Sequence, residues 1–153
     1  MVAPALSMYH QGSTPVSGQI VDADHKVQFL NINKGIPSDL LTIDIWNDKG
    51  GALGSDTAVA PILYPINNEN IDVIYAGTAS NGFASMIEAR SCAGYGVAGD
   101  MQTTWTPIKP STLTPLVMGN IPANCKRTVE IRINAPLDAP DLTLKNFILK
   151  VTA

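Results

Sequence analysis

The chain of 153 residues has the length of one ordinary domain. Apolar residues make up 45% of the sequence and charged residues 15%, so the chain can bury a core under a largely uncharged surface and does not belong to the disordered class. The formal net charge of −3 argues against a nucleic-acid-binding protein, which needs a basic surface to neutralise phosphates.

Residues 1–15 precede the first clear strand pattern, and we predict that they form an N-terminal arm, followed by one β domain over 16–153. The arm lacks a basic region and Pro4 interrupts its apolar stretch, so we expect no secretory signal. Because the arm is too apolar for a solvated tail, we expect a neighbouring molecule to hold it. The candidate assembly contacts are Val2, Leu6, Met8 and Tyr9.

Three segments alternate apolar and polar residues with the period of two that is typical of half-buried strands. They are Leu40–Trp46, Thr128–Ala135 and Lys145–Val151. The residues predicted to point inward are Leu41, Ile43 and Ile45, then Val129, Ile131 and Ile133, then Phe147, Leu149 and Val151. Weaker patterns predict strands at Gly18–Val21, Lys26–Asn33, Val59–Leu63, Asp72–Ala76, Thr103–Pro107 and Leu116–Met118.

One segment, Ser80–Gly94, has a capping residue, good helix formers and a C-terminal glycine, which favour a helix. A lone helix among strands would need its own packing partner. We therefore predict a strand over Met86–Cys92, with the helix as the alternative.

Turn signals separate the predicted strands at short intervals, including the sequence NDKGG at 47–51. Most of the 11 prolines flank strands, where a missing amide donor does least harm. This pattern predicts an all-β chain folded as a single antiparallel β-sandwich, immunoglobulin-like or jelly-roll-like.

The string Gly94–Gly99 matches G-x-G-x-x-G, the phosphate-binding turn of dinucleotide folds. That chemistry needs a strand before the glycines and a helix after them, and the residues that follow are β-prone and proline-rich. We interpret the string as a surface loop and expect no cofactor.

Two acidic strings, around Asp22–His25 and Asp44–Asp48, could supply oxygen ligands to a cation. Neither matches the spacing of a calcium loop, so we interpret both as solvated turns and expect no metal site. The histidines, His10 and His25, lie near no nucleophile motif, and His10 falls in the predicted arm. We expect no catalytic residues and no enzyme activity.

Two cysteines, Cys92 and Cys125, are too few for a disulfide scaffold or a four-ligand zinc site. We expect two reduced, largely buried thiols, because a free cysteine behaves as a small apolar residue. The charge-free stretch 110–125 contains three prolines, so we expect no membrane-spanning helix there.

Aromatic residues could form the flat platform on which sugar-binding modules stack their ligands. The candidate ligand platform is Trp46, Tyr95 and Trp105. In a β-sandwich a tryptophan belongs more often to the core. Glycan binding by these aromatic residues is therefore the alternative, and a structural role is the first expectation.

The stretch Gly119–Val151 contains a turn with I-P-A-N, an alternating strand, a P-x-D-A corner at Pro136–Ala139 and a final strand. It resembles the end of the immunoglobulin-like β-sandwich proteins found on tailed-bacteriophage virions, as do the segments Met86–Ser91 and Thr104–Ile108. The family's corners often carry a glycine where this chain has Asp141-Leu142. The resemblance carries over no functional residue.

The resemblance implies a non-enzymatic structural protein of a virion, made in the host cytoplasm without a signal peptide. We expect a capsid decoration or accessory protein, or a tail or baseplate component, that docks in many copies on a symmetric lattice. The expected partners are other virion proteins and further copies of the chain, not nucleic acid or membrane. The alternatives are a glycan- or receptor-binding module on a tail tip or cell surface, and a pilus-like sandwich.

Overall fold

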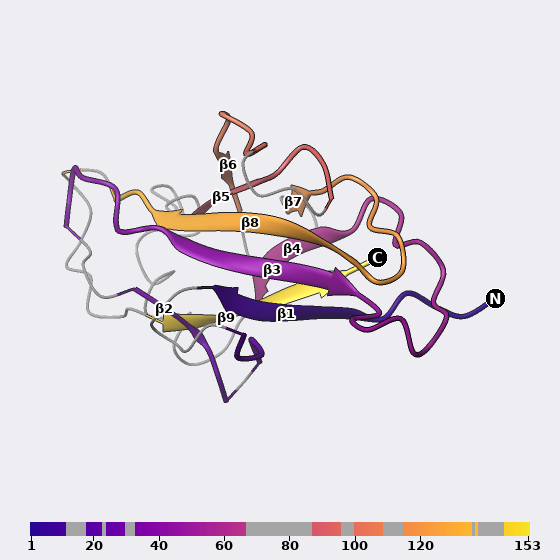
Figure 1. The fold of residues 1–153 in the computed structure, drawn as a ribbon. Helices are drawn as coiled ribbons and strands as arrows, with labels where there is room; N and C mark the ends of the chain where they lie inside the picture. Colours follow the sequence, from indigo (N-terminus) through magenta and orange to yellow (C-terminus); the bar gives the residue numbers. More distant parts are fainter. Residues whose placement is uncertain are drawn as a thin grey trace.

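The computed structural model of the chain describes residues 1–11, 18–22, 24–29, 33–66, 87–95, 100–108, 115–135, 137 and 146–153. These residues form two antiparallel sheets and no helix, as Figure 1 shows. One sheet has five strands in the order β1-β3-β8-β5-β6 and the other has four in the order β2-β9-β4-β7. The strands are β1 (Leu6–Gln11), β2 (Val27–Gln28), β3 (Leu41–Asn47), β4 (Ile62–Ile66), β5 (Ile87–Ser91), β6 (Thr106–Pro107), β7 (Leu116–Val117), β8 (Cys125–Ile133) and β9 (Asn146–Thr152).

Both sheets contribute to one hydrophobic core, which confirms the all-β, antiparallel prediction. The predicted inward residues of β3 and β8 are buried, and β9 contributes Leu149. The side chain of Phe147 lies outside the described residues. The buried apolar side chains include Ile43, Ile45, Val129 and Ile131 from the five-stranded sheet, and Val27, Leu63, Leu116 and Leu149 from the four-stranded sheet.

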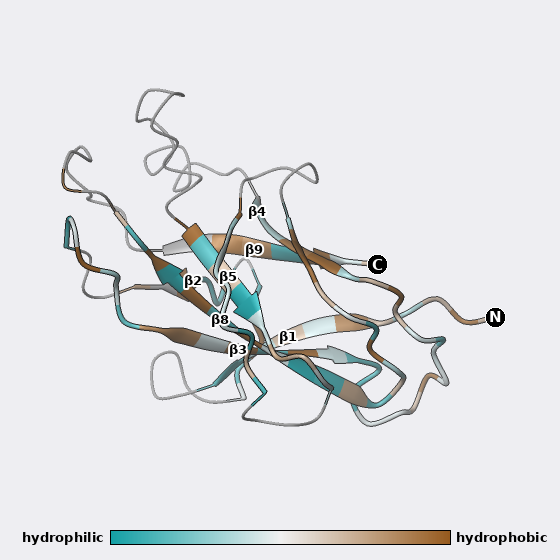
Figure 2. Cartoon of the chain, turned by 90° about the horizontal axis from the view of Figure 1, so that it is seen from above, coloured by the Kyte–Doolittle hydropathy of each residue, from teal (hydrophilic) through white to brown (hydrophobic). Residues whose placement is uncertain are grey.

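The described part of the ambiguous segment, residues 87–94, contains a strand: β5 pairs with β8 on one side and with β6 on the other. Ile87 and Ala89 enter the core, while Glu88 and Arg90 point to the opposite side of the sheet. This alternation along β5 and β8 is visible in Figure 2. The predicted strand is confirmed for residues 87–91. The strands on both sides, β6 and β8, pair with its backbone amide and carbonyl groups.

The expectation that residues 1–15 form an arm outside the β domain is wrong for Leu6–Gln11. This segment is β1, and all six of its residues pair with β3. Met8 and His10 are buried, so His10 lies in the fold and not in a separate arm. Leu6, Met8 and His10 lie on one face of β1, two residues apart. Because His10 is polar, this face does not read as an apolar alternation in the sequence, and the strand was not predicted.

The weaker predicted strands are shorter than expected. Gly18–Val21 forms only an isolated bridge, Tyr9 with Ile20, along the free edge of β1. The strand predicted at Val59–Leu63 begins later, at Ile62, because Ala60 has a positive φ of 43°. The strand predicted at Asp72–Ala76 lies outside the described residues.

Within the described ranges, the edges of both sheets offer little backbone for pairing with another chain. The edge strands β2, β6 and β7 each have two residues in the described part of the chain. The free edge of β1 is covered in part, since the amide of His10 donates to Gln19 O at 2.7 Å and the amide of Val21 donates to Met8 O at 2.8 Å. Short or covered edges are how β proteins avoid uncontrolled edge-to-edge association.

Candidate functional site

Side chains that point away from the core on β1, β3, β5 and β8 form the outer face of the five-stranded sheet. Asp44 lies near its centre and is 8% exposed. Its carboxylate accepts hydrogen bonds from Gln11 Nε2 at 2.6 Å, from Thr128 Oγ1 at 2.8 Å and from Lys126 Nζ at 2.7 Å. The negative charge of Asp44 is therefore matched by neighbours on two adjacent strands.

Trp105 and two ion pairs form what we call the Trp105 cluster, where β5, β6 and β8 meet. Arg90 Nη2 contacts Glu130 Oε2 at 2.6 Å, and Arg132 Nε contacts Glu88 Oε2 at 2.7 Å. The guanidinium carbons of Arg90 and Arg132 lie 4.5 and 4.0 Å from the centroid of the Trp105 ring. Both cations of this cluster have a carboxylate and an aromatic partner within the chain.

Lys49 follows β3 and, with Tyr9 and Trp46, forms what we call the Lys49 cluster. Its ammonium lies 3.9 Å from the centroid of Tyr9 and 5.8 Å from that of Trp46. Among the described residues, no carboxylate lies within ion-pair distance of Lys49. Lys49 is exposed, in contrast to the half-buried ion pairs of the Trp105 cluster.

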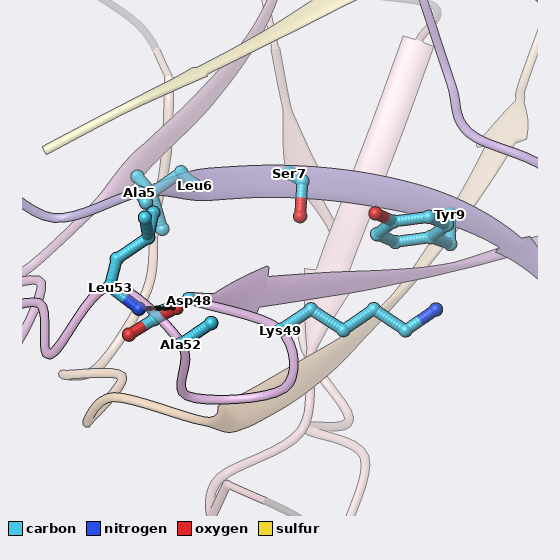
Figure 3. Close-up of a pocket in the computed structure, with 8 residues that line it drawn as sticks. All are labelled: Ala5, Leu6, Ser7, Tyr9, Asp48, Lys49, Ala52 and Leu53. Carbon is cyan, nitrogen blue, oxygen red and sulfur yellow. Dashed lines mark hydrogen bonds between the residues drawn. The ribbon is translucent and has the colours of Figure 1, made fainter.

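A hollow of about 280 Å³ opens beside the Lys49 cluster, between β1 and the loop that follows β3 (Figure 3). In Figure 3 the Ser7 hydroxyl points toward the end of β3 and the loop that follows, and the Lys49 side chain runs beneath Tyr9 with its ammonium directed away from Ala52 and Leu53. The lining residues are Ala5, Leu6, Ser7, Tyr9, Asp48, Lys49, Ala52 and Leu53.

The loop that forms one wall of this hollow is held in place by polar residues. Asp48 is buried, adopts a positive φ of 50°, and accepts hydrogen bonds from the amides of Leu53 and Ser55, both at 3.1 Å. Asn47 is fully buried, and its side chain accepts from the amide of Ala5 at 3.0 Å. The same side chain donates to the carbonyls of Asp56 and Ile121 at 2.8 and 2.9 Å.

Exposed apolar side chains lie at both ends of the molecule, and two others, Val117 on β7 and Ile20 beside β1, lie along the sheets. At the end where both chain termini lie, Val59 is 66% exposed and helps to line a second hollow of about 530 Å³ with Met1, Ala3 and Ala153. At the opposite end, Leu137 is 80% exposed and contacts the loop at Gly35. We call these the terminal end (Val2, Val59) and the distal end (Ile36, Leu40, Leu137).

The four predicted assembly contacts are not one surface. Met8 is buried in the core and Leu6 packs against it. Tyr9 belongs to the Lys49 cluster, and Val2 alone is exposed at the terminal end. An assembly role for Met8 would require the core to open, so the docking surface must be sought elsewhere.

The three aromatic residues of the predicted platform lie in separate surroundings. Trp46 lies with Tyr9 in the Lys49 cluster, and Trp105 lies between the two arginines. Tyr95 is exposed in the turn after β5. Lys49 was not singled out by sequence reasoning, which interpreted the stretch 47–51 only as a turn.

Both histidines serve structural contacts. His10 Nε2 lies 3.3 Å from the carbonyl oxygen of His25, and burial lowers the pKa of His10 below its usual 6.5. His25 Nδ1 lies 2.8 Å from Asp22 Oδ1. The same carboxylate oxygen accepts from the amides of Asp24 and His25, so Asp22 stabilises a turn.

Both cysteines are free, as predicted; Cys92 is buried and Cys125 is half-buried. The Cys92 thiol donates to Gly94 O at 2.9 Å and accepts from the amide of Thr128 at 3.2 Å. In the described ranges, no three His, Cys, Asp or Glu side chains gather as metal ligands would. Nor do those ranges contain a helix long and apolar enough to cross a membrane.

Comparison of the chain with protein-family models, with curated proteins and with solved structures gave no match.

Proposed function

We propose that this chain is a non-enzymatic structural protein of a virion, a β-sandwich of the immunoglobulin-like or jelly-roll-like type that decorates a capsid in many symmetric copies. The single observation that carries the proposal is the exposure of apolar side chains at both the terminal end and the distal end. The proposed partners are other virion proteins and further copies of the chain, after synthesis in the host cytoplasm.

The positions of the exposed apolar residues support docking through the ends of the domain. β3 has seven residues, and at about 3.3 Å per residue its two ends are separated by roughly 20 Å. A domain with one apolar surface at each end can contact two neighbours at once, as a lattice requires. The short and covered sheet edges favour side-chain contacts over strand addition.

A non-catalytic role is supported by the engagement of both histidines in the fold. His10 is buried, with Nε2 at 3.3 Å from the carbonyl oxygen of His25 and Nδ1 without a hydrogen-bond partner among the described residues, and His25 is bonded to the turn-forming Asp22. Neither ring is placed in the described residues to act as a base toward a hydroxyl or thiol nucleophile, an arrangement that acyl transfer requires.

The test is to sediment particles from a producing-cell lysate and to quantify the chain in the particle fraction. Recovery in tens to hundreds of copies per particle supports the decoration role. A few copies per particle would contradict decoration and indicate a tail component, and recovery only as free protein would contradict the virion role.

Point variants test docking better than a deletion of the N-terminal segment does. Deletion of residues 2–14 would remove β1, and with it Met8, from the fold. We expect Val59→Asp or Leu137→Asp to stay folded and to lose particle association, since each places a charge in an apolar contact. Gln102→Asp adds the same charge to an exposed loop residue and should associate normally. Normal association of both end variants would contradict docking through the ends.

The Lys49 cluster favours a second candidate function, the binding of a glycan. An unmatched cation beside two aromatic rings and a hollow is an arrangement that a lattice contact does not explain.

A further inference from the structure

We propose that the hollow beside Tyr9 and Lys49 binds a single carboxylated sugar ring of an acidic glycan, with the sugar carboxylate paired to the Lys49 ammonium. The inference rests on the second candidate function, glycan binding, and is independent of the virion role.

Lys49 and Asp48 are the two charged residues that line the hollow, and only Lys49 is free to pair with a ligand. Asp48 is buried, and its carboxylate accepts the amides of Leu53 and Ser55. Three of the described cations of the outer face have partners: Lys126 pairs with Asp44, Arg90 with Glu130, and Arg132 with Glu88. Lys49 is the one described cation on this side of the sheet without a carboxylate in ion-pair distance. A ligand carboxylate at this position would form an ion pair with Lys49, as protein carboxylates do with the other three cations.

The size of the hollow suits a single ring more than a peptide segment. Its volume of about 280 Å³ lies just below the range of sites that bind drug-sized molecules, roughly 300–1,000 Å³. Most of a ring placed there would remain solvated, which suits a sugar with several hydroxyl groups.

The walls of the hollow offer the mixture of contacts that an acidic sugar needs. The Ser7 hydroxyl faces the loop and can donate to or accept from a sugar hydroxyl. Ala5, Ala52 and Leu53 present apolar surface to the carbon–hydrogen face of the ring. Leu53 is 61% exposed, so covering it with a ligand removes apolar area from water.

The site is held in its shape before any ligand arrives. Asp48 fixes the loop through two amide hydrogen bonds, and its own amide donates to Ala5 O at 2.9 Å, which ties the loop to β1. Lys49 is already positioned over Tyr9. Pre-organisation of this kind lowers the entropic cost of binding.

Trp46 extends the site along the sheet. It is the register partner of Ser7 on the neighbouring strand, and the centroid of its ring lies 5.8 Å from the Lys49 ammonium and 5.7 Å from the Lys126 ammonium. A second sugar unit attached to the first would pass toward the Trp46 ring, so binding should change tryptophan fluorescence.

The test is a titration of the full chain with glucuronic acid, followed by NMR amide shifts and tryptophan fluorescence. Glucose and acetate serve as probes that keep only the ring or only the carboxylate. We expect glucuronic acid to bind with a dissociation constant in the millimolar range, roughly 1–10 mM, and about tenfold more tightly than either partial probe.

Two substitutions identify the cation. Lys49→Met should weaken glucuronic acid binding about tenfold without changing the unfolding temperature, because the side chain is exposed, and Lys49→Arg should restore binding to within about threefold. Lys150→Met removes an exposed cation from β9 on the other sheet and should leave the affinity unchanged.

Equal binding of glucuronic acid and acetate would contradict a sugar site, and equal binding of glucuronic acid and glucose would contradict the role of Lys49. No binding of glucuronic acid by the folded chain would overturn the proposal. The Lys49→Met variant should still sediment with particles, so failure of the sugar site and failure of the virion role are distinguishable.

Discussion

The Trp105 cluster and the Lys49 cluster use the same chemistry on the same sheet face with different results. In the Trp105 cluster, two arginines each contact the indole and each pair with a glutamate. In the Lys49 cluster, the ammonium contacts Tyr9 and Trp46 and has no described carboxylate partner. The first cluster is complete within the chain, whereas the second has charge left for a ligand.

The comparison teaches that cation–aromatic contacts alone do not identify a binding site. The ion pairs around Trp105 are 14–22% exposed, which keeps solvent from screening them and makes them part of the stability of the sheet. Lys49 is exposed and contributes little to stability, so its charge is available for recognition.

The largest expected loss of stability comes from Asn47, which holds the loop that carries Lys49 but does not belong to the Lys49 cluster. Asn47→Ala leaves one amide and two carbonyls without their partner in a fully buried site, and we expect a loss of about 3 kcal/mol in the free energy of unfolding. Chemical denaturation measures this loss. The exposed Asn120 accepts one hydrogen bond, from the amide of Ala60, and Asn120→Ala should cost about 1 kcal/mol or less. Equal losses would contradict the role assigned to Asn47.

Disruption of the Trp105 cluster should cause a smaller loss in the free energy of unfolding. Trp105→Ala removes the ring between Arg90 and Arg132, and we expect a loss of about 2 kcal/mol, below the 3–5 kcal/mol of a fully buried tryptophan because this one is half-buried. Thermal unfolding measures the loss. Tyr95→Ala, at an exposed aromatic residue, should cost no more than about 0.5 kcal/mol. A Trp105→Ala protein as stable as the Tyr95→Ala protein would show that the cluster is not structural.

The smallest effect at neutral pH concerns His10, which lies on the buried face of β1 next to Tyr9 in the sequence. Burial lowers the pKa of His10, so the native state binds fewer protons than the unfolded state. Stability is therefore fully present above the unfolded pKa of 6.5 and is lost as the pH falls from 6.5 toward the lower folded pKa, by at most about 1.4 kcal/mol per pH unit.

Urea denaturation between pH 7.5 and 5 measures this dependence. His10→Gln keeps a donor for the carbonyl of His25 and should flatten the slope in this window. An unchanged slope in the variant would assign the pH dependence to another group.

Strands with a clean alternation were predictable because local pattern and burial agree. In β3 and β8 every predicted inward residue is buried, and the strand bounds differ from the predicted ones by a few residues. The pattern failed for β1, where His10 occupies a buried position that an apolar residue would normally fill. The burial of His10 depends on the segment 18–25 that covers it, which no local pattern contains.

The candidate site was only partly predictable. Sequence reasoning singled out Tyr9 and Trp46, but it assigned them to different roles and ignored Lys49. The register of β1 against β3 places Ser7 opposite Trp46 and brings Tyr9 to the loop at 48–53. Residues far apart along the chain meet only through this pairing, so their proximity could not be derived from spacing.

The sequence by itself determined the all-β class of the fold and the inward rows of β3 and β8, because alternation with a period of two can bury an apolar face only in a sheet. For the segment 87–91 it left a helix as the alternative, and pairing with β8 and β6 decided for the strand. The tertiary structure decided which charges are matched. Whether Arg90, Arg132 or Lys49 has a carboxylate partner depends on strand order and register, and these are set by long-range packing of the core.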